Sequence, residues 1–217
     1  METKEELFAH LKDVTRVLED PLVRRAFIDI DRADFVGEDY KVEAYEDYAL
    51  PIGYGQTISQ PTTVGFMFEL LGAREGDKVL DVGSGSGWTS ALLSKIVGDK
   101  GSVTSLEIIT ELFELGEKNT KKYALKNLKQ VLVKAGQVGI PGKMFDRILV
   151  SAKSQELPPD ILLQLKDEGV LVIPVKNSIW RISGYFFCHC RKSHCQRTAV
   201  IHGFGDERRL FAAGTHN

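Results

Sequence analysis

The sequence predicts an α/β protein with a doubly wound, mostly parallel β-sheet that carries helices on both faces, preceded by an N-terminal helical segment. From Asp77 onward, short apolar runs alternate with helical patterns, which is the chain order of parallel strands joined by crossover helices. The runs are nearly continuous in Val, Leu and Ile, as expected of strands buried on both faces. A glycine-rich turn, Gly83 to Gly87, separates the first run from the next helix. These three observations predict a Rossmann-like sheet.

The length and composition are those of one globular domain. The chain has 217 residues, of which 43% are hydrophobic and 27% charged, enough to bury a full core. We expect a single domain, in which residues 1–75 form N-terminal helices and a loop, residues 76–175 the α/β core, and residues 176–217 a divergent C-terminal segment. No run approaches the ~20 apolar residues of a membrane span, and the charged start METKEELFAH is unlike a signal peptide. A cytoplasmic location is therefore expected.

The N-terminal segment is expected to hold three helices. Thr3 and Glu6 have capping-box spacing, and a helical period of apolar residues continues up to Asp20. Pro21 suits the first turn of a second helix, and Pro61 that of a third. The stretch YGQTISQP, which ends at Pro61, is expected to be a loop. The apolar residues of the first pattern are Leu7, Leu11, Val14 and Leu18.

The alternating region supplies the strands and helices of the core. The expected strands are, in order, KVLDVG, SVTSLE, KQVLVK, FDRILVSA and GVLVIPV. The expected helices lie near Ser86–Ile96, Glu111–Tyr123 and Pro159–Lys166. After Lys176, WRISGYFF is a further candidate strand and CHCRKSHC a candidate turn.

The glycine-rich turn has the spacing G-x-G-x-G, with glycine at positions 83, 85 and 87, and lacks the G-x-G-x-x-G of dinucleotide enzymes. Asp81 lies two residues before the first glycine, where a carboxylate would repel a pyrophosphate but suits a cationic ligand. Glu107 closes the next strand, where an acid can accept hydrogen bonds from both ribose hydroxyls. This combination describes a site for S-adenosyl-L-methionine and argues against an NAD oxidoreductase. A glycine-rich turn flanked by two solvated acids is the structural alternative.

Several longer motifs make the interpretation more specific. They are RAFIDIDRADFV, YEDYALPIGYGQTISQP, VLDVGSGSGW, SLEI, FDRILVSA, ELPP and EGVLVIPV, which together cover about residues 20–175. In this order and spacing the chain resembles the protein L-isoaspartate (D-aspartate) O-methyltransferase family. The resemblance implies a class I S-adenosylmethionine-dependent methyltransferase that transfers methyl to the free carboxylate of L-isoaspartyl residues in damaged proteins and peptides. We also expect a monomer with neither a membrane nor a nucleic-acid partner.

The resemblance further implies the site residues. Ser59 is the expected catalytic residue, and the loop around it is expected to cover the cofactor and the incoming peptide. A free carboxylate is already ionised at pH 7 and needs positioning rather than a general base. The alternative role of Ser59 is the N-cap of the helix that starts at Pro61. The expected cofactor-binding residues are Thr57, Ile58, Ser59, Asp81, Gly83, Ser84, Gly85, Gly87, Glu107, Ile108 and Gly136.

Three segments of the chain depart from the family pattern. The family commonly has Gly-Asp-Gly near the adenine, whereas Lys134, Ala135 and Gly136 occupy these positions here. Thr62 stands where relatives often carry His or an aromatic residue, which affects the expected substrate pocket. Lys153 lies near the expected cleft, where it could attract an acidic peptide, but we expect it to point to solvent because lysine is seldom buried.

The C-terminal segment leaves two rival functions open. Residues 176–217 carry seven Lys and Arg against two acids, so the first 175 residues hold a net charge of −7 within the total of −2. This basic segment, with Thr62 and Ala135, would suit a methyltransferase that acts on tRNA, while the missing adenine-site acid would suit a non-catalytic binding protein. No metal site is expected, because the Cys and His spacing fits zinc poorly and reduced thiols are the simpler interpretation. The cluster comprises Cys188, His189, Cys190, His194 and Cys195.

Overall fold

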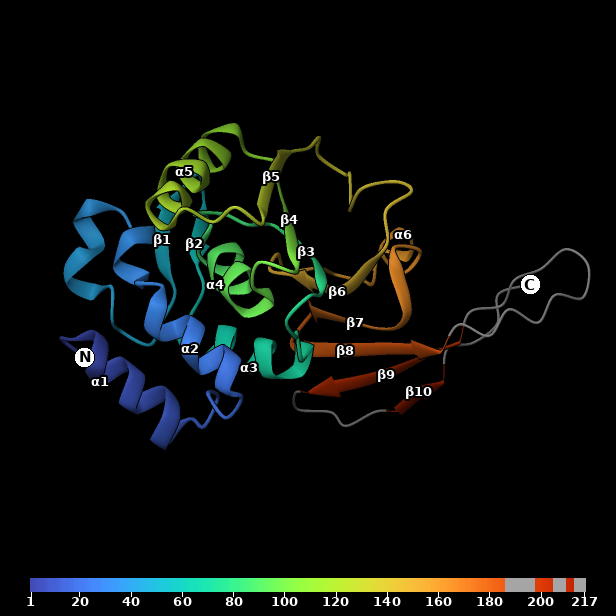
Figure 1. Ribbon diagram of the computed structural model, residues 1–217, viewed down its shortest axis with the longest axis horizontal. Helices are drawn as coiled ribbons and strands as arrows, with labels where there is room; N and C mark the ends of the chain where they lie inside the picture. Colours follow the sequence, from blue (N-terminus) through green and yellow to red (C-terminus); the bar gives the residue numbers. More distant parts are fainter. Residues whose placement is uncertain (186–197, 205–209, 213–217) are drawn as a thin grey trace, which may run out of the picture.

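The computed structural model describes residues 1–185, 198–204 and 210–212. Its main sheet has eight strands in the order β10-β9-β8-β7-β6-β3-β4-β5 (Figure 1). The pairs among β3 to β7 are parallel, and β8, β9 and β10 are added antiparallel at one edge. The predicted doubly wound, mostly parallel sheet is therefore confirmed. The strands are β3 (Lys78–Val82), β4 (Ser102–Glu107), β5 (Leu128–Leu132), β6 (Phe145–Val150), β7 (Leu165–Val175), β8 (Ser178–Tyr185), β9 (Thr198–Phe204) and β10 (Leu210–Ala212).

The order of the strands reverses at β3. From β3 the chain passes outward through β4 to β5, and it then returns to β6, which pairs with β3 on the other side. Connections that leave in opposite directions from adjacent strands open a crevice at the carboxyl ends of those strands. The end of β3, between β4 and β6, is therefore where this sheet can bind a ligand.

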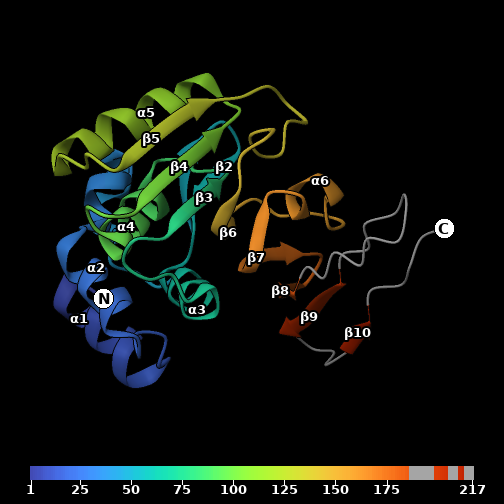
Figure 2. The ribbon, with the colours of Figure 1, turned by 45° about the vertical axis from the view of Figure 1, so that its right-hand side comes forward.

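Apolar side chains alternate across the sheet and build a core on each face. Val79 belongs to the larger core, which includes residues of α2, α3, α4 and α5, while Leu80 belongs to the smaller one with α6. Figure 2 shows the same division, with α6 on the opposite side of the sheet from α2 to α5. The helices are α1 (Lys4–Ala9), α2 (Pro21–Asp29), α3 (Pro61–Leu71), α4 (Trp88–Val97), α5 (Thr110–Thr120) and α6 (Pro159–Leu162).

The predicted helix near Pro159–Lys166 is wrong in length. α6 ends at Leu162, and β7 begins at Leu165, whose partner in the parallel ladder is Phe145. Ile161 and Leu165 are both fully buried, so one apolar run serves two elements. Periodicity alone could not locate the boundary between them.

The N-terminal helix begins as predicted but ends early. The expected capping box of α1 is present, and the helix continues as a π-helical turn, His10–Val14. Val14 is 69% exposed, and Arg16 has a φ of 53°, which ends the helical path. Leu18 is buried as expected, but it reaches the core from the irregular segment before Asp20.

The predicted loop before Pro61 contains a small β-hairpin. β1 (Leu50–Gly53) and β2 (Gln56–Ile58) pair antiparallel in a sheet of their own, and Tyr54 at the tip has a φ of 54°. Short 3-10 turns complete the chain at Arg32–Phe35, Glu38–Glu43 and Lys121–Tyr123. The hairpin lies beside the carboxyl ends of the central strands, so it covers the crevice described above.

The described part of the C-terminal segment forms the strands β8, β9 and β10. WRISGYFF contributes the strand β8, which confirms a strand at this place. The turn CHCRKSHC and all five residues of its Cys and His cluster lie outside the described ranges. Within those ranges, His, Cys, Asp and Glu form no group of three or more that could hold a metal ion. Among the same residues, no helix has the length and apolar character needed to cross a membrane.

Candidate active site

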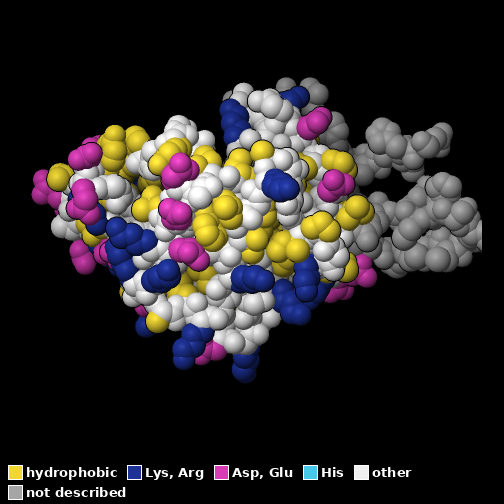
Figure 3. Space-filling model, turned by 90° about the horizontal axis from the view of Figure 1, so that it is seen from above, with side chains coloured by type: hydrophobic (Ala, Val, Ile, Leu, Met, Phe, Trp, Pro, Cys, Tyr) yellow, Lys and Arg dark blue, Asp and Glu magenta, His cyan; other side chains and the backbone are white. Residues whose placement is uncertain are grey.

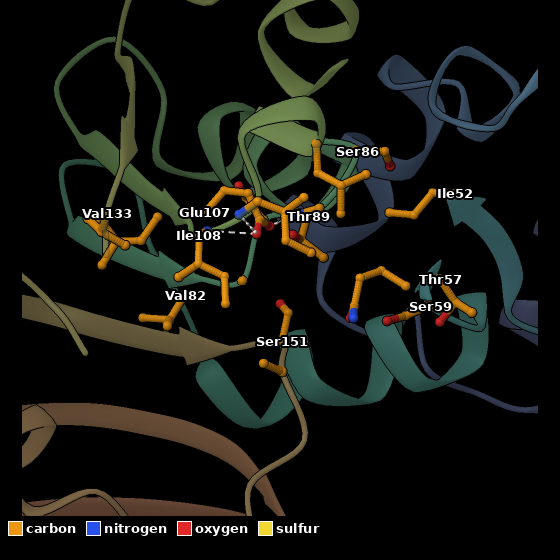
Figure 4. Close-up of a pocket in the computed structure, with 18 of the residues that line it drawn as sticks. Ile52, Thr57, Ser59, Val82, Ser86, Thr89, Glu107, Ile108, Val133 and Ser151 are labelled. Carbon is orange, nitrogen blue, oxygen red and sulfur yellow. Dashed lines mark hydrogen bonds between the residues drawn. The ribbon is translucent and has the colours of Figure 1, made fainter. Parts of the chain in front are cut away.

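A cavity of about 290 Å³ opens at the carboxyl ends of β3, β4 and β6, at the point where the strand order reverses. Its walls come from the β1–β2 hairpin, the glycine loop, the start of α5 and the segment that follows β5. Figure 4 shows Thr57 and Ser59 on one side, Val133 and Glu107 on the other, and Ser151 between them. Nine expected cofactor-binding residues line this cavity: Thr57, Ile58, Ser59, Gly83, Ser84, Gly85, Glu107, Ile108 and Gly136.

The glycine loop turns between β3 and α4 in a conformation that requires glycine. Gly83, Gly85 and Gly87 have φ values of 83°, 53° and 89°, a region that residues with a Cβ rarely adopt. The amides of Gly83 and Ser84 both donate to the Leu106 carbonyl, at 2.9 and 3.0 Å, which ties the loop to β4. Gly87 lies outside the cavity lining: a Cβ there would stand 3.2 Å from the Gly116 carbonyl oxygen of α5. Its role is close packing of the loop against that helix.

Glu107 holds the edge of the cavity in shape. Its side chain is 6% exposed; Oε2 accepts from the Gly85 amide at 2.8 Å, and Oε1 accepts from the amides of Ile108 and Ile109 at 2.7 and 3.0 Å. The carboxylate thus joins the glycine loop to the start of α5. A carboxylate offers about four acceptor positions, so capacity for a ligand hydroxyl remains beside these three bonds.

Asp81 lies behind the glycine loop and does not line the cavity, contrary to the direct contact expected from the sequence. Its fully buried carboxylate accepts hydrogen bonds from Ser90 at 2.6 Å, Thr89 at 2.8 Å and Ser151 at 3.2 Å. Burial raises the pKa of Asp81, and these three hydroxyls oppose the rise. Thr89 and Ser151 do line the cavity, so Asp81 orients two hydroxyls of the wall.

Ser59 lies between the hairpin and α3 and does not cap the helix. The N-cap of α3 is Gln60. The amide of Thr62, in the first turn of α3, donates to the Asp47 carboxylate at 2.8 Å. Among the described residues the Ser59 hydroxyl has no hydrogen-bond partner, although its carbonyl accepts from Arg32 at 3.2 Å. The capping alternative is therefore not supported, and the hydroxyl is available to a molecule in the cavity.

The departures from the family pattern fall at the margin of the site. Thr62 donates through Oγ1 to Asp47 at 2.7 Å and does not line the cavity. Lys153 is exposed, as expected, and Ala135 is exposed beside Gly136. Gln137 does line the cavity, next to Gly136, and it is a polar side chain that the sequence interpretation overlooked.

The sequence interpretation also missed side chains that come directly after strands. Ser151 follows β6 and Val133 follows β5, and both line the cavity. Their position at the carboxyl end of a strand was the available signal, because ligands of doubly wound sheets bind there. Ile52 and Trp88 are large apolar lining residues that carried no comparable signal.

Asp47 is expected to stabilise the start of α3 in a pH-dependent way. Burial would raise its pKa, but hydrogen bonds from Thr62 and Gln60 and the nearby His10 outweigh it, so the pKa lies below its ordinary value. A carboxyl with a lowered pKa contributes stability above its unfolded pKa of about 3.9 and loses it as the pH falls through the folded value. Asp47→Asn should therefore cost about 1–2 kcal/mol at neutral pH, and the cost should shrink below about pH 4.

Thermal denaturation of wild type and Asp47→Asn over this pH range checks the expectation. Asp13→Asn is the matched control, because the Asp13 side chain is 65% exposed and its ion pair is with the exposed Lys12. A difference in melting temperature between wild type and Asp47→Asn that does not change with pH would contradict the stabilising role of the Asp47 charge.

A doubly wound sheet with a glycine loop after β3 and an acid at the end of β4 defines a class I S-adenosylmethionine-dependent methyltransferase fold. Over residues 2–194 the chain matches the family model described as protein-L-isoaspartate(D-aspartate) O-methyltransferase. The chain belongs to this family.

Similar proteins agree with this assignment. The chain is 45% identical over 162 residues to protein-L-isoaspartate O-methyltransferase 2 of Archaeoglobus fulgidus, covering 74% of both chains. It is 44% identical over 154 residues to protein-L-isoaspartate O-methyltransferase of Methanopyrus kandleri, covering 70% of this chain and 68% of the relative. A solved protein-L-isoaspartate O-methyltransferase structure aligns with a TM-score of 0.79 at 26% identity, over 98% of this chain and 66% of the other. A Plasmodium falciparum structure that contains S-adenosyl-L-homocysteine has the same fold, with a TM-score of 0.77 at 22% identity over 98% and 99% of the two chains.

Proposed function

We propose that this protein transfers a methyl group from S-adenosyl-L-methionine to the free carboxylate of L-isoaspartyl residues in damaged proteins and peptides, as a repair enzyme. The observation that carries the proposal is the Ser59 hydroxyl, which has no partner among the described residues and lines the same cavity as the glycine loop and Glu107. Membership of the family supports the choice of reaction.

The residues of the cavity fit S-adenosyl-L-methionine. A Cβ on Gly83 would stand 3.1 Å from the Cβ of Ala152, and one on Gly85 would stand 3.1 Å from Ile52, so the loop forms a cradle that side chains would fill. The Glu107 carboxylate, held in place by backbone amides, can accept hydrogen bonds from a pair of ribose hydroxyls. The buried Asp81 carboxylate lies behind hydroxyls of the cavity wall and favours a positively charged group on the cavity side of them. When bound, the cofactor supplies an electrophilic methyl group on a sulfonium.

The chain's own residues have to orient the acceptor. The substrate carboxylate is ionised at neutral pH and needs no general base, so the task is to bring one oxygen into line with the methyl group. Ser59 donates a single neutral hydrogen bond to that carboxylate, which holds it without the strong ground-state grip of an arginine. Ile58 and Trp88 are buried apolar residues of the lining and keep bulk water from the two opposite charges.

Methyl transfer from labelled S-adenosyl-L-methionine tests the proposal. The acceptors are an isoaspartyl peptide, its normal aspartyl isomer and tRNA, assayed under the same conditions. We expect label in the isoaspartyl peptide alone. Label in tRNA would replace the proposed acceptor, and tight cofactor binding without transfer to any acceptor would indicate a non-catalytic binding protein.

We propose further that residues 1–217 act as one methyltransferase domain, as a cytoplasmic monomer without a nucleic-acid partner. The net charge of −7 over the first 175 residues disfavours nucleic acid. On the face in Figure 3, acidic and basic side chains both occur among the described residues, mixed with hydrophobic ones. The molar mass of the purified protein, measured by light scattering, tests whether it is a monomer.

A further inference from the structure

Arg32 is a buried cation that the mechanism above does not use. It begins the 3-10 turn Arg32–Phe35 after α2, and it is only 3% exposed. Placing a guanidinium group out of water is costly unless hydrogen bonds compensate. The groups that accept hydrogen bonds from Arg32 therefore indicate which part of the fold it stabilises.

Within the described part of the chain, the Arg32 side chain donates four hydrogen bonds, all to backbone carbonyls of the segment that carries the hairpin. Nη1 donates to Ala44 at 2.8 Å and to Glu46 at 3.0 Å, and Nη2 donates to Tyr48 at 2.8 Å and to Ser59 at 3.2 Å. The first three carbonyls precede β1, whereas the fourth follows β2. One side chain thus ties together the two ends of the hairpin.

The guanidinium group of Arg32 also lies over a side chain that lines the cavity. Its Cζ lies 5.5 Å from the ring centre of Trp88, a cation–π contact, and Trp88 lines the cavity. Burial lowers the pKa of Arg32 to about 10, partly offset by Asp47 and Tyr48, so the group stays protonated at neutral pH. Its planar fork presents donors from two separate nitrogens in a fixed geometry, whereas the three donors of a lysine ammonium radiate from a single nitrogen.

We propose that Arg32 is a positioning residue for the methyl acceptor: its hydrogen bond to the Ser59 carbonyl fixes where the Ser59 hydroxyl stands in the cavity. This rests on the proposed role of Ser59 in methyl transfer. The carbonyl and the hydroxyl belong to one residue, so a shift of the backbone moves the donor that orients the substrate carboxylate. Small errors in the alignment of the reacting groups reduce transfer steeply.

The test compares Arg32→Lys with the matched control Arg181→Lys. Arg181 is half-buried and, like Arg32, binds a backbone carbonyl, that of Leu70 at 2.9 Å, but it does not line the cavity. Arg32→Gln, which keeps two amide donors without the charge, is the second variant. For each protein we would measure the dissociation constant of S-adenosyl-L-homocysteine and the hydrogen exchange over residues 44–59. We would also measure KM and kcat for an isoaspartyl peptide, with kcat expressed per site that binds S-adenosyl-L-homocysteine.

In Arg32→Lys we expect kcat/KM to fall at least about tenfold, with a change in the S-adenosyl-L-homocysteine dissociation constant below about threefold. Exchange over residues 44–59 should speed up in Arg32→Lys but not in Arg181→Lys. Parallel losses in both affinity and kcat/KM, or unchanged exchange with unchanged kinetics, would overturn the proposal. Loss of all binding-competent protein in both Arg32 variants would also overturn it, because Arg32 would then serve folding alone.

The exchange measurement separates this proposal from the proposed function. If wild type does not methylate the isoaspartyl peptide, the proposed function fails. The exchange over residues 44–59 still reports whether Arg32 holds the hairpin and Ser59 in place.

Discussion

Ser59→Asp is expected to lose at least about a hundredfold in kcat/KM while remaining folded and able to bind S-adenosyl-L-homocysteine. The new carboxylate would stand where the hydroxyl now faces the cavity, and it would repel the carboxylate that must attack. Two like charges about 4 Å apart near a protein surface repel by about 4 kcal/mol, more than enough for this loss. Folding should survive because Ser59 is half-buried and does not cap α3.

Two further variants separate the effect of the added charge from the effect of losing the Ser59 hydroxyl. Ser59→Gly removes the donor without adding charge, so it should be less impaired than Ser59→Asp. Thr63→Asp is the matched control, because Thr63 lies on the first turn of α3 and outside the cavity lining, with its hydroxyl bonded to Gln60. Steady-state kinetics with an isoaspartyl peptide give the comparison. Wild-type kinetics in Ser59→Asp would remove Ser59 from the reaction.

Glu107→Ala is expected to weaken the binding of S-adenosyl-L-homocysteine and also to lower the melting temperature. A charged acceptor of hydroxyl hydrogen bonds contributes about 1.5–3 kcal/mol per bond, so affinity should fall at least about tenfold. The melting temperature should fall because the carboxylate also accepts from three backbone amides, which alanine would leave without a partner.

Calorimetry with S-adenosyl-L-homocysteine, below the melting temperature of each variant, checks the effect on affinity. Glu111→Ala is the control, because Glu111 is an exposed acid in the first turn of the same helix, α5. A lower melting temperature with unchanged affinity would restrict Glu107 to holding the glycine loop.

The parallel core could be predicted because its signals are local. Continuous apolar runs bounded by glycine give the strands, and the positive φ values of Gly83 and Gly85 explain why glycine stands there. α6 was predicted too long because Ile161 and Leu165 are buried alike in helix and strand. No local sequence pattern distinguishes the buried residue of the helix from the buried residue of the strand.

Much of the site depends on contacts between distant residues. Asp81 was expected to meet the ligand, yet three hydroxyls, one of them from the residue after β6, surround it instead. Arg32 resembles an ordinary surface residue in the sequence, and only the fold brings it to carbonyls up to 27 positions away. The capping role of Ser59 was plausible until Asp47 was found at the start of α3.

Mass spectrometry of an isoaspartyl peptide incubated with the protein and S-adenosyl-L-methionine tests the central claim most directly. The claim predicts one methyl group, carried as an ester on the free carboxylate of the isoaspartyl residue. Loss of methanol to the succinimide and partial appearance of normal aspartate should follow. A methyl group on any other atom, or an unmodified peptide in the presence of protein that binds S-adenosyl-L-homocysteine, would contradict it.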